Sequence, residues 1–435
     1  MTIMRGLTTI PRLARALQSL SSQAGVASGS VTSTWSQPKD APTSSQSAAR
    51  HYSVGSKRSW LHTAVMPQEQ QAWDEPSTSS RSSSSASHVN VDPFSIVHTE
   101  VGSISERLRH SVTSTIPVLR KAAEYFFRPG VEGKRLRPTL IMLMASALSS
   151  EPPPLDCLGV DNRPANVRAP EPRRRQQRVA EIAELIHVAS LLHDDVLDDA
   201  VTRRGVASVN EIMGNKTAIL AGDFLLARAS VTLASLDNNE IVELMSAVLE
   251  HLVSGEIMQM TATNEQRQDL EHYLQKTYCK TASLMANSAR SVAVVAGHGK
   301  QVCDLAWGYG RHLGLAFQIV DDVLDLTASS SILGKPALND MKSGLATAPV
   351  LFAAEEQPAL RPLIARKFKQ EGDVAQAMSL IERSAGIQRA KELAQHHAAM
   401  AAQMINSLPA ATHEHATLSR HGLLAVTQLV LNRKK

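Results

Sequence analysis

Residues 180–200 read AEIAELIHVASLLHDDVLDDA, and this stretch decides the fold class. Apolar side chains recur at every third or fourth position, namely at Ile182, Leu185, Ile186, Ala189, Leu192 and Val196. This spacing is typical of one buried face of an α-helix. Similar spacing covers most of the chain after residue 91, where strictly alternating Val, Ile and Thr runs are absent. We therefore predict an all-α protein built from long packed helices.

Two clusters of three aspartates lie in these helical stretches, one in HDDVLDDA and one in QIVDDVLD. Their members are Asp194, Asp195 and Asp198 in the first cluster, and Asp321, Asp322 and Asp325 in the second. Positions i, i+1 and i+4 share one side of a helix, so the carboxylates repel each other unless a cation lies among them. Mg²⁺ suits such ligands and binds through few carboxylates plus substrate phosphates. Two facing clusters could hold a diphosphate through bridging Mg²⁺; an exposed acidic helix face is the alternative for either cluster alone.

A diphosphate also needs positive charge, and several basic or polar residues meet this need. Arginine matches phosphate oxygens with paired donors, and lysine acts as a point charge. The candidates are Lys134 and Arg137 in GKRLRP (residues 133–138), Arg203 and Arg204, Lys280 and Thr281, Gln318, and Lys335. A solvated surface residue is the alternative for each of them alone. His187 lies about two helical turns before Asp194, and an ordinary core histidine is its alternative.

The composition separates an N-terminal arm from the rest of the 435 residues. From residue 1 to residue 68, Asp40 is the single acidic residue, against Arg5, Arg12, Arg15, Lys39, Arg50, Lys57 and Arg58. We predict that residues 1–90 are a transit peptide and a disordered Ser-rich linker, since this composition is typical of organelle targeting. The expected location is the mitochondrion, with the plastid as the alternative. Residues 91–435 are predicted to form one catalytic domain.

The remaining composition excludes several classes of function. Net charge is only +4 and aromatic residues make up 4%, so we expect no nucleic-acid partner. We also expect no transmembrane helix, because no window of 18 apolar residues is evident. Three cysteines, Cys157, Cys279 and Cys303, are far apart and match neither a disulfide framework nor a zinc site.

Residues 149–176 interrupt the helical pattern with many Pro and Arg residues. We predict an exposed insertion loop between two helices. Its basic stripe, Arg173 to Arg175, is expected to be solvated; binding to a partner or a membrane surface is the alternative.

Together these motifs resemble the trans-polyprenyl diphosphate synthases, which elongate isoprenoid chains head to tail. The matching stretches, in order, are GKRLRP, IHVASLLHDDVLDDAVTRRG, GNKTAILAGDFLLARA, SGEIMQM, KTASLMANSA, GLAFQIVDDVLDLT, GKP and MKSGLATAPVLFA. The resemblance covers residues 92–435 and is strongest to the long-chain members that make quinone side chains, such as solanesyl and decaprenyl diphosphate synthases. Leu345 departs from the shorter-chain members, which have a lysine there, and one phosphate contact is thereby in doubt.

The resemblance implies an all-α bundle around a deep central cavity, usually in a homodimer, with two to three Mg²⁺ ions per active site. It implies that the six aspartates bind these ions and that Arg203 contacts the allylic diphosphate. It assigns Lys134, Arg137, His187 and Arg204 to the diphosphate of isopentenyl diphosphate. It places Lys280, Thr281, Gln318 and Lys335 along the allylic substrate, which is geranyl, farnesyl or geranylgeranyl diphosphate.

Ala189 and Ser190 lie one turn before Asp194, where shorter-chain relatives have bulky aromatics. We therefore expect a wall that admits a long product, of eight to ten isoprene units. A second, different subunit and peripheral contact with a membrane are both compatible with the sequence.

Three other functions are weighed against this one. Terpene cyclases and head-to-head squalene-type synthases share an aspartate motif but lack GKRLRP and the second DDVLD. A non-catalytic regulatory subunit of a hetero-oligomer tends to lose aspartates or arginines that are all present here. A shorter-chain geranylgeranyl diphosphate synthase is the third.

Overall fold

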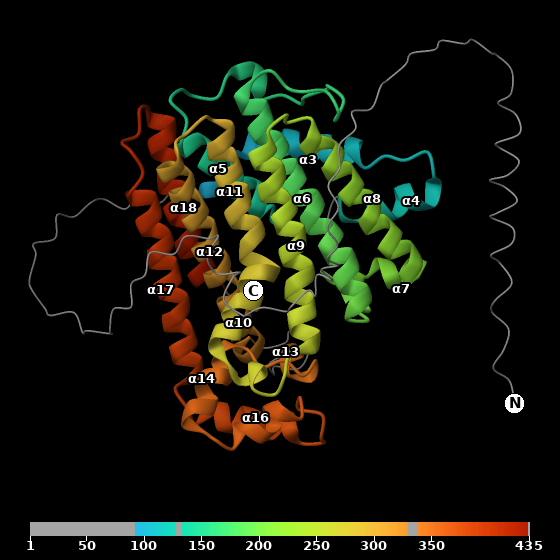
Figure 1. Cartoon of the computed structure of the whole chain (residues 1–435), viewed down its shortest axis with the longest axis vertical. Coiled ribbons are helices and arrows are strands. Elements are labelled where there is room, and N and C mark those ends of the chain that lie inside the picture. Colours follow the sequence, from blue (N-terminus) through green and yellow to red (C-terminus); the bar gives the residue numbers. More distant parts are fainter. Residues whose placement is uncertain (1–91, 128–132, 329–337, 434–435) are drawn as a thin grey trace, which may run out of the picture. The chain divides into compact units, whose positions relative to one another are not determined.

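The computed structural model describes residues 92–127, 133–328 and 338–433, all of which belong to the compact unit Ser85–Lys435. Within these residues nearly every element is a helix (Figure 1), which confirms the all-α prediction. The elements are α2 (Pro93–Ile96), α3 (His98–Ser111), α4 (Pro117–Ala123), η1 (Tyr125–Phe127), α5 (Leu136–Ala147), η2 (Leu155–Cys157), α6 (Pro172–Leu197), β1 (Thr202–Arg203), β2 (Val206–Ala207), α7 (Val209–Met213), α8 (Asn215–Ala234), α9 (Asn239–Thr261), η3 (Gln266–Gln268), α10 (Leu270–Thr277), η4 (Tyr278–Ala282), α11 (Ser283–Val295), α12 (Lys300–Thr327), α13 (Asn339–Lys342), α14 (Ala348–Glu356), α15 (Leu360–Ala365), α16 (Asp373–Glu382), α17 (Gly386–Asn406) and α18 (Glu414–Leu431).

Helix α6 contains Asp194 and Asp195 and ends at Leu197, and Asp198 of the same cluster is its C-cap residue. Pro172 opens the helix, where its missing N–H costs nothing. Asp199 adopts a left-handed conformation, with φ of 49°. The amide of Ala200 then donates to the carbonyl of Asp195 at 2.9 Å, as in a Schellman motif. This stop fixes the aspartates in the last turn of the helix.

Helix α12 contains the second cluster and packs on α11 and α17. Two glycines, Gly310 and Gly314, permit the contact with α11 and η4. A Cβ on Gly314 would lie 2.5 Å from the Cα of Ala282, and one on Gly310 would lie 2.7 Å from the Cα of Ala286. This close approach brings η4 beside the middle of α12.

The insertion differs from its prediction at its C-terminal end. Helix α6 begins at Pro172, so Arg173 to Arg175 are helical, and Arg173 and Arg174 are buried. Two nitrogens of Arg173 donate to the carboxylate of Glu100 at 2.8 and 2.5 Å. The prediction of a solvated basic stripe was wrong, and so was its alternative. Arg173 is paired with buried Glu100, and Arg174 donates to the backbone carbonyls of Asp156 and Gly159, so neither guanidinium faces solvent or a partner.

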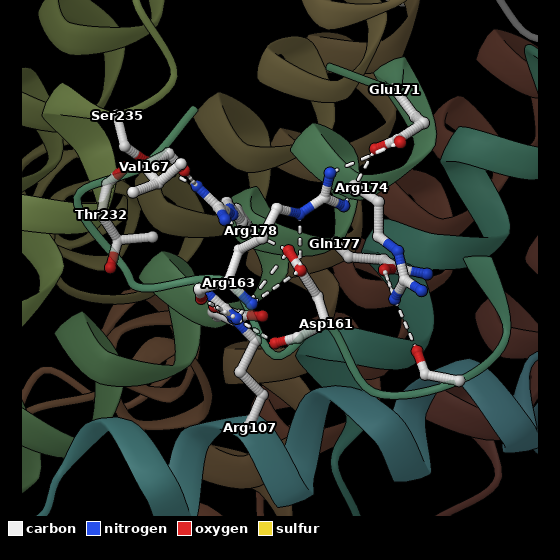
Figure 2. Close-up of polar contacts among 12 residues, drawn as sticks. Arg107, Asp161, Arg163, Val167, Glu171, Arg174, Gln177, Arg178, Thr232 and Ser235 are labelled. Atoms are coloured by element: carbon white, nitrogen blue, oxygen red, sulfur yellow. Dashed lines mark hydrogen bonds and ion pairs between the residues drawn. The ribbon is translucent and has the colours of Figure 1, made fainter. Parts of the chain in front are cut away.

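Figure 2 shows how the insertion is joined to the bundle. The carboxylate of Asp161, in the insertion, accepts hydrogen bonds from Arg163 at 2.7 Å and from Arg178 of α6 at 3.1 Å. Arg107 of α3 also lies within ion-pair distance of Asp161. A buried network of arginines and carboxylates therefore ties α3, the insertion and α6 together.

Candidate active site

The first cluster is organised around Asp195, which is fully buried. Nε of Arg203 donates to Oδ1 of Asp195 at 2.8 Å, and Nη2 contacts the same oxygen. Oδ2 of Asp195 is buried and has no hydrogen-bond partner among the described residues. Arg203 thus holds one carboxylate oxygen and leaves the other one available.

Arg203 and Arg204 lie on a β-hairpin that the sequence analysis did not predict. Strands β1 and β2 pair antiparallel, with Arg203 opposite Val206. Both turn residues have positive φ, 53° at Arg204 and 80° at Gly205, as a two-residue type I′ turn requires. The turn directs the guanidinium of Arg204 against Gly133, where a Cβ would lie 2.9 Å from Nη2. The glycine of GKRLRP therefore makes room for an arginine 71 positions later.

Arg137 and His187 form a pair beside this hairpin. Nη1 of Arg137 lies 2.9 Å from Nε2 of His187. Burial, together with the charges of Arg137, Arg204 and Arg203, lowers the pKa of His187 well below its ordinary value. The imidazole is therefore neutral at physiological pH and accepts a hydrogen bond from Arg137. Lys134, three positions before Arg137, is exposed to solvent. Lys335 lies outside the described residues.

The three aspartates of the second cluster have different surroundings. Asp322 is buried and accepts hydrogen bonds from the hydroxyl of Tyr273 at 2.6 Å and from Nε2 of Gln318 at 2.9 Å. Asp321 forms an ion pair of 2.8 Å with Arg433. Both oxygens of Asp325 accept backbone amides at the start of α13, at 3.0 Å each. Asp325 caps a helix here, and its role as a metal ligand stays a prediction.

Lys280 and Thr281 lie in η4, a short π-helical segment between α10 and α11. Such segments occur often at functional sites. Nζ of Lys280 donates to Glu256 of α9 at 2.5 Å. The hydroxyl of Thr281 donates to Oε1 of Gln318 at 3.0 Å, so a hydrogen-bonded row runs from Thr281 through Gln318 to Asp322.

Two lysines one turn apart connect the two clusters electrostatically. Burial raises the pKa of Asp194 to about 6, and the charge of Lys280 opposes this rise. Burial and the neighbouring Asp340 raise the pKa of Asp322 to about 7, and the charge of Lys276 opposes that rise. A cavity of about 230 Å³ lies beside them, with Asp198, Glu256 and Lys276 in its lining. Asp198 is the member of the two clusters in this lining. Tyr273 also lines the cavity and donates to Asp322, so the cavity adjoins the second cluster through Tyr273.

Comparison with known proteins places this geometry in a family. A family model described as Polyprenyl synthetase matches residues 116–381. The chain belongs to the polyprenyl synthetase family.

Relatives and solved structures agree with this membership. The chain is 48% identical over 385 residues to "Solanesyl-diphosphate synthase 1, mitochondrial" of Oryza sativa subsp. japonica, covering 88% of this chain and 89% of that protein. It is 38% identical to "All trans-polyprenyl-diphosphate synthase PDSS1" of Homo sapiens, covering 79% and 78%. The crystal structure of a polyprenyl synthase from Caulobacter crescentus CB15, complexed with calcium and isoprenyl diphosphate, matches with a TM-score of 0.66 at 26% identity, covering 82% of this chain and 100% of that one.

These findings confirm that the protein is a prenyltransferase with an all-α fold. The mitochondrial names of several relatives confirm the expected location. The plastid alternative agrees with a relative from Arabidopsis thaliana that is named "chloroplastic/mitochondrial".

Two properties of the aspartates in this polyprenyl synthetase fit the binding of Mg²⁺. Within the described ranges, no three Asp, Glu, His or Cys side chains are already gathered as a metal site. The buried Oδ2 of Asp195 nevertheless lacks a partner, and the pKa values of Asp194 and Asp322 are raised. A nearby cation stabilises the charged form of carboxylates that are unpartnered or have a raised pKa. Mg²⁺ takes its remaining ligands from phosphate and water.

The expected wall residues lie on the buried side of α6. Ala189 is fully buried, and the hydroxyl of Ser190 donates to the carbonyl of His187 at 2.9 Å. Their role in product length stays a prediction.

Sequence reasoning missed several residues of the site. Tyr273 has no sequence signal, because its hydroxyl reaches Asp322 only through the packing of α10 on α12. Glu256 belongs to SGEIMQM, one of the stretches that carry the family resemblance, but the resemblance assigned no role to this residue. Arg433 follows the last helix and covers Asp321, with its guanidinium 4.2 Å from the ring centre of Phe317. His193, to which no role was given, lies over Gly222 and joins α6 to α8.

Proposed function

We propose that this protein is a long-chain trans-polyprenyl diphosphate synthase. It adds isopentenyl diphosphate repeatedly to an allylic diphosphate, and its product becomes the isoprenoid side chain of a mitochondrial quinone. The observation that carries the proposal is a cavity lined by Asp198 of the first cluster, Lys276 and Tyr273, whose hydroxyl donates to Asp322 of the second cluster at 2.6 Å. A cavity with carboxylates and a cation at its wall suits a metal-bound diphosphate.

Each elongation step breaks one C–O bond and forms one C–C bond. The allylic C1–O bond breaks, and diphosphate leaves with the electron pair. The double bond of isopentenyl diphosphate then attacks C1, and the resulting cation loses a proton to form the new double bond. The departing diphosphate accepts this proton, since the described residues offer no neutral base dedicated to it. Bound Mg²⁺ supplies Lewis-acid stabilisation of the leaving group.

The residues of the chain would bind the metal and the two diphosphates and orient the groups that contact them. Asp194, Asp195 and Asp198 would hold metal on one side and Asp321 and Asp322 on the other. Arg203 keeps Asp195 in place through Oδ1. Arg137 and Arg204 provide the positive charge for the second diphosphate, and neutral His187 orients Arg137. The row Thr281–Gln318–Asp322 fixes the amide of Gln318 beside the reacting centre.

We also propose a homodimer that forms through α8 and α9. Among the described residues, α8 is the one helix that is long and apolar enough to cross a membrane. Only 33% of its apolar 18-residue window is buried in the protein. It packs on α6 and α4 and also contacts α9, and we take the exposed apolar side chains of α8 and α9 as one face. This face includes Ile219, Leu220 and Val231 of α8, and Val242, Val253, Ile257 and Met260 of α9. An apolar face of this kind typically marks a protein interface.

The decisive experiment is incubation of the purified chain with farnesyl diphosphate, labelled isopentenyl diphosphate and Mg²⁺, followed by mass spectrometry of the products. We expect eight to ten isoprene units. A product that stops at four units would identify a geranylgeranyl diphosphate synthase instead. No product from the chain alone, with product restored by a second subunit, would identify a hetero-oligomer.

Light scattering on the same preparation tests the dimer. Val253→Asp should shift the mass toward the monomer, because it places a charge on the α8–α9 face. Leu155→Asp is the matched control, since Leu155 is 85% exposed in the insertion and lies outside that face.

A further inference from the structure

Lys367 lines the same cavity as Asp198, from a part of the chain to which no motif gave a role. The lining joins Asp198 at the end of α6 to the segment Ser343–Ala346 and to Lys367, which follows α15. Figure 1 shows α10, α13, α14 and α16 at the same end of the bundle.

The backbone at Lys367 is in an unfavourable conformation. Lys367 has φ of 58° and Phe368 has φ of 53°, both in the left-handed region. The amide of Lys367 donates to the carbonyl of Ile364, and that of Phe368 to Leu363, each at 3.0 Å. These bonds end α15 at a position where glycine is the usual residue. A lysine there costs stability, and strain of this kind clusters at functional sites.

The side chain of Lys367 runs along a glycine toward the cavity. Gly344 has φ of 83°, and a Cβ on it would lie 3.0 Å from Cβ and 3.7 Å from Cδ of Lys367. Leu345 follows on the same wall and has no charge to offer. Nη2 of Arg267 donates to the carbonyl of Ala365 at 3.3 Å and so anchors the end of α15 to the turn before α10.

Two of the three carboxylates that line the cavity are engaged elsewhere, and the third is Asp198 of the first cluster. Glu256 accepts the ammonium of Lys280, and Asp269 accepts the amides of Glu271 and His272 at 3.1 Å. Across the part of the chain that the structure describes, no ion pair includes Lys367. An ammonium group at the rim of this cavity has no structural partner there, and an anionic ligand would provide one.

We propose that Lys367 binds the diphosphate of the allylic substrate, opposite Asp198. This inference rests on the proposed function and adds a binding residue to it. Lys367 supplies the charge that Leu345 does not provide. It also explains why a lysine occupies a helix end where glycine would be more stable.

Lys367→Gly should make the protein more stable and at the same time weaken its binding of farnesyl diphosphate. The variant should unfold at a higher temperature, because glycine relieves the left-handed strain. Its KM for farnesyl diphosphate should nevertheless rise about tenfold, as expected for losing one charged contact. Its kcat and its KM for isopentenyl diphosphate should change little. Lys369→Gly, at an exposed position outside the cavity lining, is the matched control.

Two rescue variants complete the test. Lys367→Arg should retain the wild-type KM within about threefold, since it keeps the charge. Adding Leu345→Lys to Lys367→Gly should recover part of the lost affinity, because position 345 lines the same cavity. An unchanged KM for farnesyl diphosphate in Lys367→Gly would overturn the proposal.

Calorimetric binding of inorganic diphosphate with Mg²⁺ separates this inference from the proposed function. It requires no turnover, so it remains informative even if the wild-type chain does not elongate farnesyl diphosphate. Weaker binding by Lys367→Gly than by wild type and Lys369→Gly supports the assignment. Equal binding by all three proteins overturns it.

Discussion

Nη1 of Arg137 lies 2.9 Å from Nε2 of His187, across 50 positions of sequence. The contact joins the motif GKRLRP to the helix that contains the first aspartate cluster. Because His187 is half-buried beside three arginines, it stays neutral and presents a lone pair to Arg137. The two side chains therefore act as one unit, in which the histidine orients the cation.

His187→Ala should raise the KM for isopentenyl diphosphate about tenfold, since an oriented charged hydrogen bond is lost. The KM for the allylic substrate should change little. Steady-state kinetics with each substrate varied in turn measures both values. A double variant with Arg137→Ala should be no worse than Arg137→Ala alone; fully additive losses would contradict the coupling of the pair.

Asp194→Ala and Asp321→Ala should each reduce turnover by at least about two orders of magnitude, because each removes stabilisation of the leaving diphosphate. Single-turnover assays at saturating Mg²⁺ would measure this loss. Asp304→Ala is the control, since Asp304 pairs with Lys300 and Arg290 away from the cavity. Near-wild-type turnover in either test variant would contradict the metal roles.

Ala189→Phe should shorten the product, because a ring would fill the space beside α6 through which the hydrocarbon must pass. The side chain at 189 is fully buried, so overpacking should also cost about 1–3 kcal/mol of stability. Mass spectrometry of the products tests the prediction, with thermal unfolding to confirm a folded variant. Ala399→Phe, on the exposed side of α17, should leave product length unchanged. Wild-type product from a folded Ala189→Phe protein would reject the role of this wall.

Arg173→Ala should lower the free energy of unfolding by roughly 3–5 kcal/mol, because it leaves the buried carboxylate of Glu100 without its charged partner. Arg168→Ala should cost less than about 1 kcal/mol, since Arg168 and Asp237 form an exposed pair. Denaturant titration of both variants compares the two sites. Equal, small losses would mean that the insertion is not held by the buried network.

The contribution of the pair His312 and His397 to stability should fall as the pH drops below about 6.5, the ordinary pKa of histidine. Nδ1 of His312 lies 3.0 Å from Nδ1 of His397, where α12 packs on α17. Burial, together with nearby positive charge, lowers the pKa of His312 to about 3 and that of His397 to about 4. Above pH 6.5 both are neutral in the folded and the unfolded chain. Below it, the unfolded chain binds protons that the folded chain does not.

By pH 5 this pair should contribute a loss of about 2–4 kcal/mol relative to pH 7.5. Denaturant titrations at the two pH values give the change. His397→Gln should show roughly half of the loss attributed to the pair, because it removes one titrating group and keeps an amide near His312. A pH dependence identical to wild type would exclude this origin.

Much of the site could be predicted from local sequence. A 3.6-residue period specifies the helices, and aspartates at i, i+1 and i+4 share one side of a helix whatever surrounds it. GKRLRP and the second DDVLD indicated the candidate phosphate-binding and metal-binding residues by type and spacing. The hairpin of Arg203 and Arg204 escaped prediction, because each of its strands has only two residues.

Other features depend on contacts between distant segments. Arg173 looked like a surface residue in a basic run, but its partner Glu100 lies 73 positions earlier on α3. Tyr273 and Arg433 reach the second cluster only because α10 and the end of α18 pack beside α12. No local pattern specifies such partners.

The amino-acid order by itself determined the all-α class, the two acidic clusters and the cations that accompany them, since periodicity and residue type are local properties. Only the tertiary structure decided which aspartates stay available. Asp195 keeps one oxygen unpartnered, whereas Asp325 gives both of its oxygens to backbone amides. The physical reason is that a carboxylate's partners are set by which helices pack beside it, and close contacts such as that of Gly314 with Ala282 fix this packing.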